Sequence, residues 1–104
     1  MTTDVFHYEN DQLSAAGVPL AEIARGVGTP FYVYDPAAAL ARFRGLSSAF
    51  EGVPHLHCVA LKANSQPALL RPLFAEGAGA EVVSGAELAL ALALGLPASR
   101  IVFS

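Results

Sequence analysis

One lysine stands out among the residues that could take part in chemistry. Lys62 is the only lysine of the 104-residue chain, beside five arginines, and it directly follows the apolar run 56–61, in which only His57 is polar. Such a run is typical of a buried strand, and α/β folds place their sites at the carboxyl ends of strands. A lysine amine can form a Schiff base with a carbonyl compound, whereas a guanidinium stays protonated and cannot. Lys62 is therefore a candidate catalytic residue.

The residues before Lys62 support this interpretation. In a strand, alternate side chains share a face, so Cys58 and Ala60 lie on the same face as Lys62. Both are small and would leave room for a ligand below the amine. Burial disfavours the ammonium form of lysine, which would favour the reactive free amine. The ordinary alternative is a solvated charge at a strand end.

Three polar residues in the segment 81–87 are further candidates. Glu81 opens an apolar strand, and a buried carboxylate needs a partner, so a role in a site is one interpretation. Ser84 and Glu87 have the spacing of a capping box, which explains them as the start of a helix. His55 and His57 would lie on the face opposite Lys62, and we interpret them as packing residues.

Four short apolar or aromatic runs predict strands at residues 31–34, 56–61, 81–83 and 101–103. Three helices are predicted between them. The first begins with Asp35 as cap and Pro36 in the first turn. The second begins near residues 64–65 and ends at Gly77, with a kink at Pro72. The third begins at Ser84 and ends at Gly95. This alternation indicates parallel strands, in a (β/α)8 barrel or a doubly wound sheet.

The first 30 residues are less regular and form a separate N-terminal lead-in, with a short strand at residues 5–8 and a short helix at 19–25. We expect residues 1–30 to pack outside the barrel and residues 31–104 to form its first βα units. A complete barrel needs about 250 residues, so we interpret the chain as an incomplete one.

Composition excludes several classes of protein. Hydrophobic residues make up 54% of the chain and charged residues 14%, which excludes disorder. The net charge of −3 and the absence of a basic patch argue against nucleic acid as a partner. The single cysteine, Cys58, allows no internal disulfide and no paired-cysteine metal site. No apolar run is long enough to span a bilayer, and no signal peptide is evident, so we expect a cytoplasmic protein that binds neither membrane nor metal.

Several segments, in order, resemble one enzyme family. Residues 59–64, Val-Ala-Leu-Lys-Ala-Asn, are similar to the cofactor-lysine motif of the fold-type III decarboxylases that use pyridoxal 5′-phosphate. Residues 28–35, 77–87 and 96–104 resemble segments that surround this motif in the family, and the resemblance covers about residues 19–104. It implies the first part of a pyridoxal-phosphate-binding (β/α)8 TIM barrel of the alanine racemase-like type.

The resemblance also implies roles for single residues. Lys62 matches the lysine that holds pyridoxal 5′-phosphate as an internal aldimine. Glu81 stands where the family usually has aspartate close to the cofactor. Ser84 and Glu87 match the serine and the glutamate that follow it in the family. Val59 stands where an aromatic residue is usual. The phosphate-binding residues would follow Ser104.

The reaction that the resemblance implies is α-decarboxylation of a small amino acid, with meso-diaminopimelate as the expected substrate and lysine as the product. Decarboxylation of ornithine, arginine or carboxynorspermidine stays open, as does a non-catalytic regulatory protein derived from such an enzyme. The family implies a homodimer for the full-length protein. The chain alone is expected to be inactive.

Overall fold

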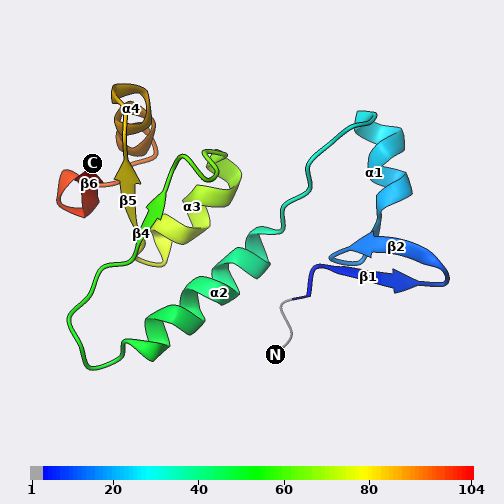
Figure 1. Ribbon diagram of the computed structural model, residues 1–104, viewed down its shortest axis with the longest axis horizontal. Helices are drawn as coiled ribbons and strands as arrows, with labels where there is room; N and C mark the ends of the chain where they lie inside the picture. The colour runs from blue at the N-terminus through cyan, green and yellow to red at the C-terminus, as the bar shows by residue number, and fades with distance from the viewer. Residues whose placement is uncertain (1–3) are drawn as a thin grey trace.

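The computed structural model describes residues 4–104, which form two units joined by an extended segment (Figure 1). The N-terminal unit contains β1 (Phe6–Glu9), β2 (Gln12–Ala15), β3 (Val18–Pro19) and α1 (Leu20–Val27). The second unit, called the α/β unit below, contains α2 (Pro36–Ala49), β4 (Cys58–Ala60), α3 (Pro67–Ala75), β5 (Gly79–Val82), α4 (Gly85–Ala93), the short 3₁₀ helix η1 (Ala98–Arg100) and β6 (Ile101–Phe103).

The N-terminal unit is an antiparallel sheet in the order β1-β2-β3, with α1 packed against β2 and β3. Two-residue turns join the strands, and the backbone φ is positive at Asn10, Asp11, Ala16 and Gly17. Positive φ at both central residues matches the right-handed twist of a hairpin. The predicted strand at 5–8 and helix at 19–25 are confirmed within two residues, whereas β2 and β3 were not predicted. Residues 1–3 of the predicted lead-in lie outside the described residues.

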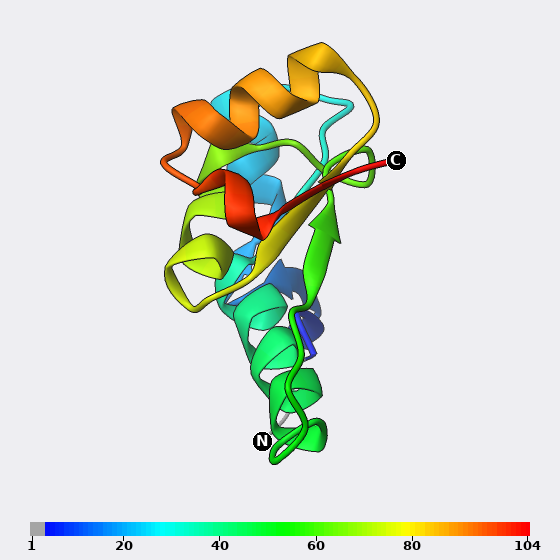
Figure 2. The same cartoon turned by 90° about the vertical axis from the view of Figure 1, so that its left-hand side faces the viewer.

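The α/β unit is built on a parallel sheet in the order β4-β5-β6. Ala60 lies opposite Glu81, which in turn lies opposite Val102. Helical segments lead from each strand to the next, so the predicted alternation and parallel pairing are confirmed for these three strands. Figure 2 shows the strands β4 and β5 beside each other, with the chain ending on β6.

The helices cover one face of this sheet. Ala80 and Val82 of β5 are fully buried in a core whose other members come mainly from the helices and the loops beside them. The core residues are Leu61, Leu70, Leu73, Phe74, Ala78, Ala80, Val82, Ala91 and Leu96. By strand alternation, Glu81 and Val102 project from the opposite face, and Val102 is 48% exposed. Val82 points into the helical layer instead, where it is fully buried.

Local start and stop signals define the helices as predicted. The Asp35 carboxylate accepts a hydrogen bond from the Ala37 N–H (3.0 Å) at the start of α2. Gly77 and Gly95 adopt positive φ just after α3 and α4. Helix α3 continues through Pro72 and begins at Pro67, after the predicted start.

The predicted strand at residues 31–34 is wrong. This segment is extended but pairs with no strand among residues 4–104, and Tyr32 is 89% exposed. Aromatic and β-branched residues favour extended backbone, but a strand also needs a neighbour for its N–H and C=O groups. The other predicted strands are shorter or shifted, since β4 begins at Cys58 and β5 ends at Val82, whereas β6 matches its prediction.

No helix formed by residues 4–104 combines the length and the apolar character needed to cross a bilayer.

Candidate functional site

A cleft of about 790 Å³ lies where β4 ends. Lys62 occupies the turn that directly follows β4, and the polar residues after it continue along the cleft towards the start of α3. The cleft is formed by three separate stretches of the chain, and its lining residues are Tyr32, Tyr34, Pro36, Leu61, Lys62, Ala63, Asn64, Ser65, Gln66, Ala68, Leu69 and Glu87.

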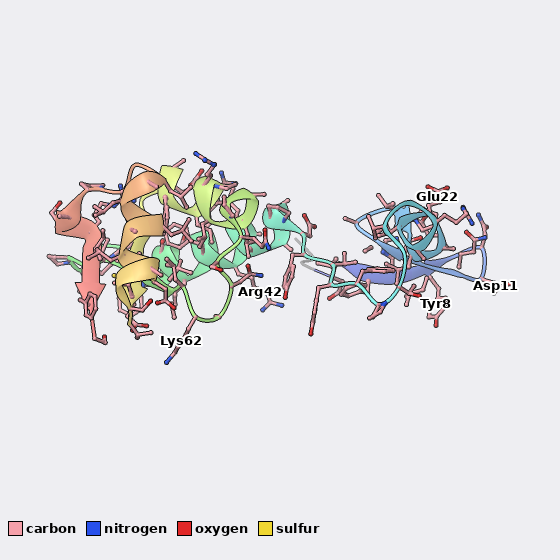
Figure 3. The ribbon with its side chains drawn as sticks, turned by 90° about the horizontal axis from the view of Figure 1, so that it is seen from above. Tyr8, Asp11, Glu22, Arg42 and Lys62 are labelled. Atoms are coloured by element: carbon pink, nitrogen blue, oxygen red, sulfur yellow. The ribbon has the colours of Figure 1, made fainter. Side chains whose placement is uncertain are left out.

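The Lys62 side chain is exposed, and Figure 3 shows it extending from its loop away from the ribbon. Its neighbour Leu61 is only 1% exposed and anchors the loop in the core. The Leu61 N–H also donates to the Glu81 carbonyl at 3.1 Å, which continues the sheet by one residue. Residues 4–104 therefore do not provide the burial that would favour the free amine of Lys62. The Lys62 amine is accessible to solvent, while the neighbouring residue Leu61 is packed in the core.

Two tyrosines that sequence reasoning did not select also line the cleft. Tyr32 and Tyr34 stack with ring centroids 6.4 Å apart and an interplanar angle of 16°. They alternate along the extended segment before α2, so both rings point to one side. A sequence signal existed in the Tyr-Val-Tyr pattern, but we assigned it to a strand. The pair gives the cleft an aromatic wall.

Glu87 contributes the carboxylate of the cleft. The Ser84 hydroxyl accepts a hydrogen bond from the Glu87 N–H (3.1 Å), and the Glu87 Oε1 atom accepts one from the Val83 N–H (2.9 Å). The predicted capping interaction is thereby confirmed, with the carboxylate reaching one residue further back than the cap itself. The position of Glu87 in the Lys62 cleft was not predicted.

The other two predicted site residues do not line this cleft. Glu81 is half-buried in β5 and projects from the uncovered sheet face beside Ala60. Ser84 sits at the start of α4, where its hydroxyl is used as a helix cap. Lys62 and Glu87 thus line the same cleft, whereas Glu81 lies on the strand next to β4.

The histidines lie at the opposite end of β4 from Lys62. The His57 ring packs edge-on against Phe50, with centroids 4.9 Å apart, and lies 4.6 Å from His55. This aromatic contact confirms His57 as a packing residue. Within residues 4–104, no three histidine, cysteine, aspartate or glutamate side chains gather closely enough to hold a metal ion.

Comparison with known proteins assigns the chain to a family. Residues 37–104 match the pyridoxal-binding domain of the pyridoxal-dependent decarboxylases. The chain therefore belongs to this family.

The individual relatives are diaminopimelate decarboxylases. The enzyme of Pseudomonas fluorescens is 48% identical over 97% of this chain, and that of Vibrio cholerae is 42% identical over 97%. The chain spans about a quarter of the length of these relatives. In solved structures, a protein of Aquifex aeolicus matches 95% of the chain and 24% of its own length, with a TM-score of 0.88 and 42% identity. Diaminopimelate decarboxylase of M. jannaschii, crystallised with L-lysine, matches 99% of the chain and 25% of its own length, with a TM-score of 0.83 and 29% identity.

The residues of the cleft fit the cofactor that the family implies. Pyridoxal 5′-phosphate is an aldehyde, and its covalent partner in a protein must be a primary amine. Lys62 supplies an exposed amine in a cleft large enough for a cofactor-sized molecule. The aromatic wall formed by Tyr32 and Tyr34 is compatible with a flat ring nearby.

Proposed function

We propose that this chain is part of an enzyme that decarboxylates meso-diaminopimelate to lysine with pyridoxal 5′-phosphate as its cofactor. The observation that carries the proposal is the accessible amine of Lys62 at the carboxyl end of β4, in a chain of the pyridoxal-dependent decarboxylase family. The diaminopimelate decarboxylases found at 48% and 42% identity favour this substrate over ornithine, arginine or carboxynorspermidine.

Lys62 would hold the cofactor through its ε-amine, with water leaving as the amine condenses with the aldehyde. When bound, pyridoxal 5′-phosphate supplies an electron sink for the pair left behind as the α-carboxylate departs as CO₂. Glu81 is proposed to lie close to the cofactor, because it projects from the uncovered sheet face one strand away from Lys62. Ser84 supports the same region by fixing the β5–α4 turn.

Other parts of the proposal concern the whole protein. We propose a cytoplasmic homodimer, in which the lead-in of residues 1–30 packs outside the barrel. Figure 1 shows β1, β2 and α1 set apart from the parallel sheet, which is consistent with that arrangement. The uncovered sheet face, with Ala60, Glu81 and Val102, would become part of the barrel interior.

The test uses a polypeptide of the relatives' full length that contains this chain. We expect borohydride reduction after incubation with pyridoxal 5′-phosphate to leave one stable pyridoxyl group on the Lys62 peptide, as read by mass spectrometry. Lys62→Arg keeps the positive charge but cannot condense with an aldehyde, so it is the matched control and should lose both the label and decarboxylation. A label on another peptide, with Lys62 unmodified, would contradict the assignment.

A further inference from the structure

We propose that a second cavity, at the end of the α/β unit away from Lys62, binds a small carboxylate with an apolar body through Arg71 and Arg100. The cavity has a volume of about 310 Å³ and lies where α3 and α4 end and where η1 leads into β6. In parallel βα units the connecting helices run back along the sheet, so their carboxyl ends lie at the opposite edge from the carboxyl ends of the strands. The cavity is therefore separate from the cleft of Lys62, and the proposal goes beyond the proposed function.

The two arginines reach the cavity from different elements but meet at one turn of α3. Arg100 belongs to η1, and its Nη2 atom donates hydrogen bonds to the carbonyl oxygens of Phe74 (2.7 Å) and Ala78. Arg71 precedes Phe74 by three residues, and residues at this spacing are neighbours on one face of a helix. The Arg100 guanidinium is thus fixed beside the turn from which Arg71 extends, and both side chains line the cavity.

Both guanidinium groups keep unused hydrogen-bond donors. The Arg100 Nε atom is buried and has no acceptor among residues 4–104, because the two bonds to carbonyl oxygens involve Nη2 alone. The Arg71 side chain is exposed and makes no hydrogen bond or ion pair with these residues. Capping the end of α3 accounts for one nitrogen of Arg100. It accounts neither for the buried Nε, which costs free energy without an acceptor, nor for the second arginine.

The charge of the two arginines is not balanced at the cavity. Among residues 4–104, those that line it include no aspartate or glutamate. Glu76, which directly follows α3, is already engaged by two hydrogen bonds from Arg44. Two positive groups beside one cavity favour an anion, and the planar guanidinium matches the two oxygens of a carboxylate.

The remaining wall of the cavity is mainly apolar and determines the rest of the ligand. Phe74 and Leu96 are almost fully buried, and they line the cavity together with the half-buried Leu94. The volume is near the lower limit of about 300 Å³ for ligand pockets, so the ligand is small. A carboxylate on a short aliphatic or aromatic body satisfies both the charged and the apolar wall.

The experiment measures ligand binding to a polypeptide of the relatives' full length by saturation-transfer NMR. Benzoate is the probe, because it joins a carboxylate to an apolar ring whose protons give the signal. Benzyl alcohol has the same ring without the charge and is the matched ligand. We expect benzoate to bind saturably, and benzyl alcohol to bind about tenfold more weakly, because hydrogen bonds between charged groups are the stronger ones.

Three variants locate the bound probe. Arg71→Gln removes one charge and no hydrogen bond made within residues 4–104, and it should weaken benzoate binding about three- to tenfold, a range that allows for the exposure of this side chain. Arg42→Gln is the matched control, because Arg42 is exposed on α2, does not line the cavity and gives the same change in net charge. It should leave the affinity unaltered, and so should Lys62→Gln in the other cleft.

Absent or unsaturable benzoate binding, or equal affinities in Arg71→Gln and Arg42→Gln, would overturn the proposal. Equal affinity for benzyl alcohol would do the same, because the cavity would then recognise no charge. Loss of the benzoate signal in Lys62→Gln would assign the probe to the other cleft and also contradict it. Pyridoxyl labelling of Lys62 is independent of all these outcomes, so failure of the proposed function is distinguishable from failure of this inference.

Discussion

The two units of the chain are organised by different physical effects. The N-terminal unit pairs neighbouring strands through two-residue turns, and Ser14 and Ala15 are its buried residues. The α/β unit pairs Cys58 with Gly79 and Ala80 with Ile101, across intervening helices, and contains the hydrophobic core. Turn geometry therefore dominates the first unit, and burial dominates the second. Changes in the α/β unit should have effects that depend on packing with distant residues.

The largest expected effect is self-association of the chain through the α/β unit and not through the N-terminal unit. Within residues 4–104, β4 and β6 each have an edge without a neighbour, and the sheet face with Val102 is uncovered. At about 25 cal/mol per Å², even a few hundred Å² of uncovered apolar surface corresponds to several kcal/mol. We expect the 104-residue chain alone to self-associate and to lack decarboxylase activity.

Two lysine substitutions, one in each unit, test which unit causes the self-association. Val102→Lys puts a charge on the uncovered sheet face and should shift the chain towards monomer in size-exclusion chromatography. Val27→Lys puts the same charge on α1 of the N-terminal unit, where Val27 is already 71% exposed, and should leave the elution unchanged. A wild-type chain that elutes as a monomer and melts cooperatively would show that the open sheet is stable by itself.

Glycine-to-alanine changes test the same contrast between turn geometry in the N-terminal unit and packing in the α/β unit. Their expected effects are smaller. A Cβ on Gly79 would lie 2.6 Å from the Arg100 carbonyl oxygen and 2.9 Å from the Cys58 sulfur, so Gly79→Ala should destabilise the full-length polypeptide by about 1–3 kcal/mol. Gly17 has open space around it but a φ of +83°, so Gly17→Ala should cost about 1 kcal/mol through the backbone alone.

Gly45 is the matched control for both, because it lies inside α2 with open space and ordinary φ. Gly45→Ala should stabilise by about 0.5–1 kcal/mol. Urea unfolding midpoints provide the measurement. If Gly79→Ala were as mild as Gly17→Ala, close packing between the strands would not be what sets the α/β unit apart.

Sequence reasoning succeeded where the deciding signal is local. Asp35 and Ser84 start helices because a side-chain oxygen satisfies a backbone N–H two or three residues away, which spacing alone can predict. The turns at residues 10–11 and 16–17 carry an equally local signal, Asn-Asp and Ala-Gly, but the short strands beside them have little apolar alternation. They were missed for that reason.

The site was predicted only in part, because its residues come together through tertiary structure. Lys62 was selected as a candidate from its own strand and its residue type. Tyr32 and Glu87 reach the same cleft from segments about 30 and 25 residues away along the chain, and no local pattern indicates that meeting. The strand expected at 31–34 failed for the same reason, since pairing depends on a neighbour.

The smallest expected effect concerns two side-chain contacts, one that joins α2 to the end of α3 and one within β1 of the N-terminal unit. Arg44 of α2 donates two hydrogen bonds to Glu76 after α3, whereas His7 and Glu9 pair within β1 (2.8 Å). The hydrogen bond from Arg44 holds the pKa of the Glu76 carboxyl below its usual value. A lowered pKa in the folded state means that the pair contributes stability above the usual pKa of glutamate and loses it as the pH falls through the lowered value.

Acidification should therefore reduce the hydrogen-exchange protection of α2 slightly in the full-length polypeptide. The effect is small because both side chains are exposed, with 59% of Arg44 and 35% of Glu76 accessible to water. Glu76→Gln should lower protection at neutral pH and abolish this part of the pH dependence, while Glu9→Gln should leave α2 unaffected, because the His7 pair joins residues within one strand. If α2 protection in Glu76→Gln followed pH as the wild type does, the long-range ion pair would not be the group that links α2 to α3.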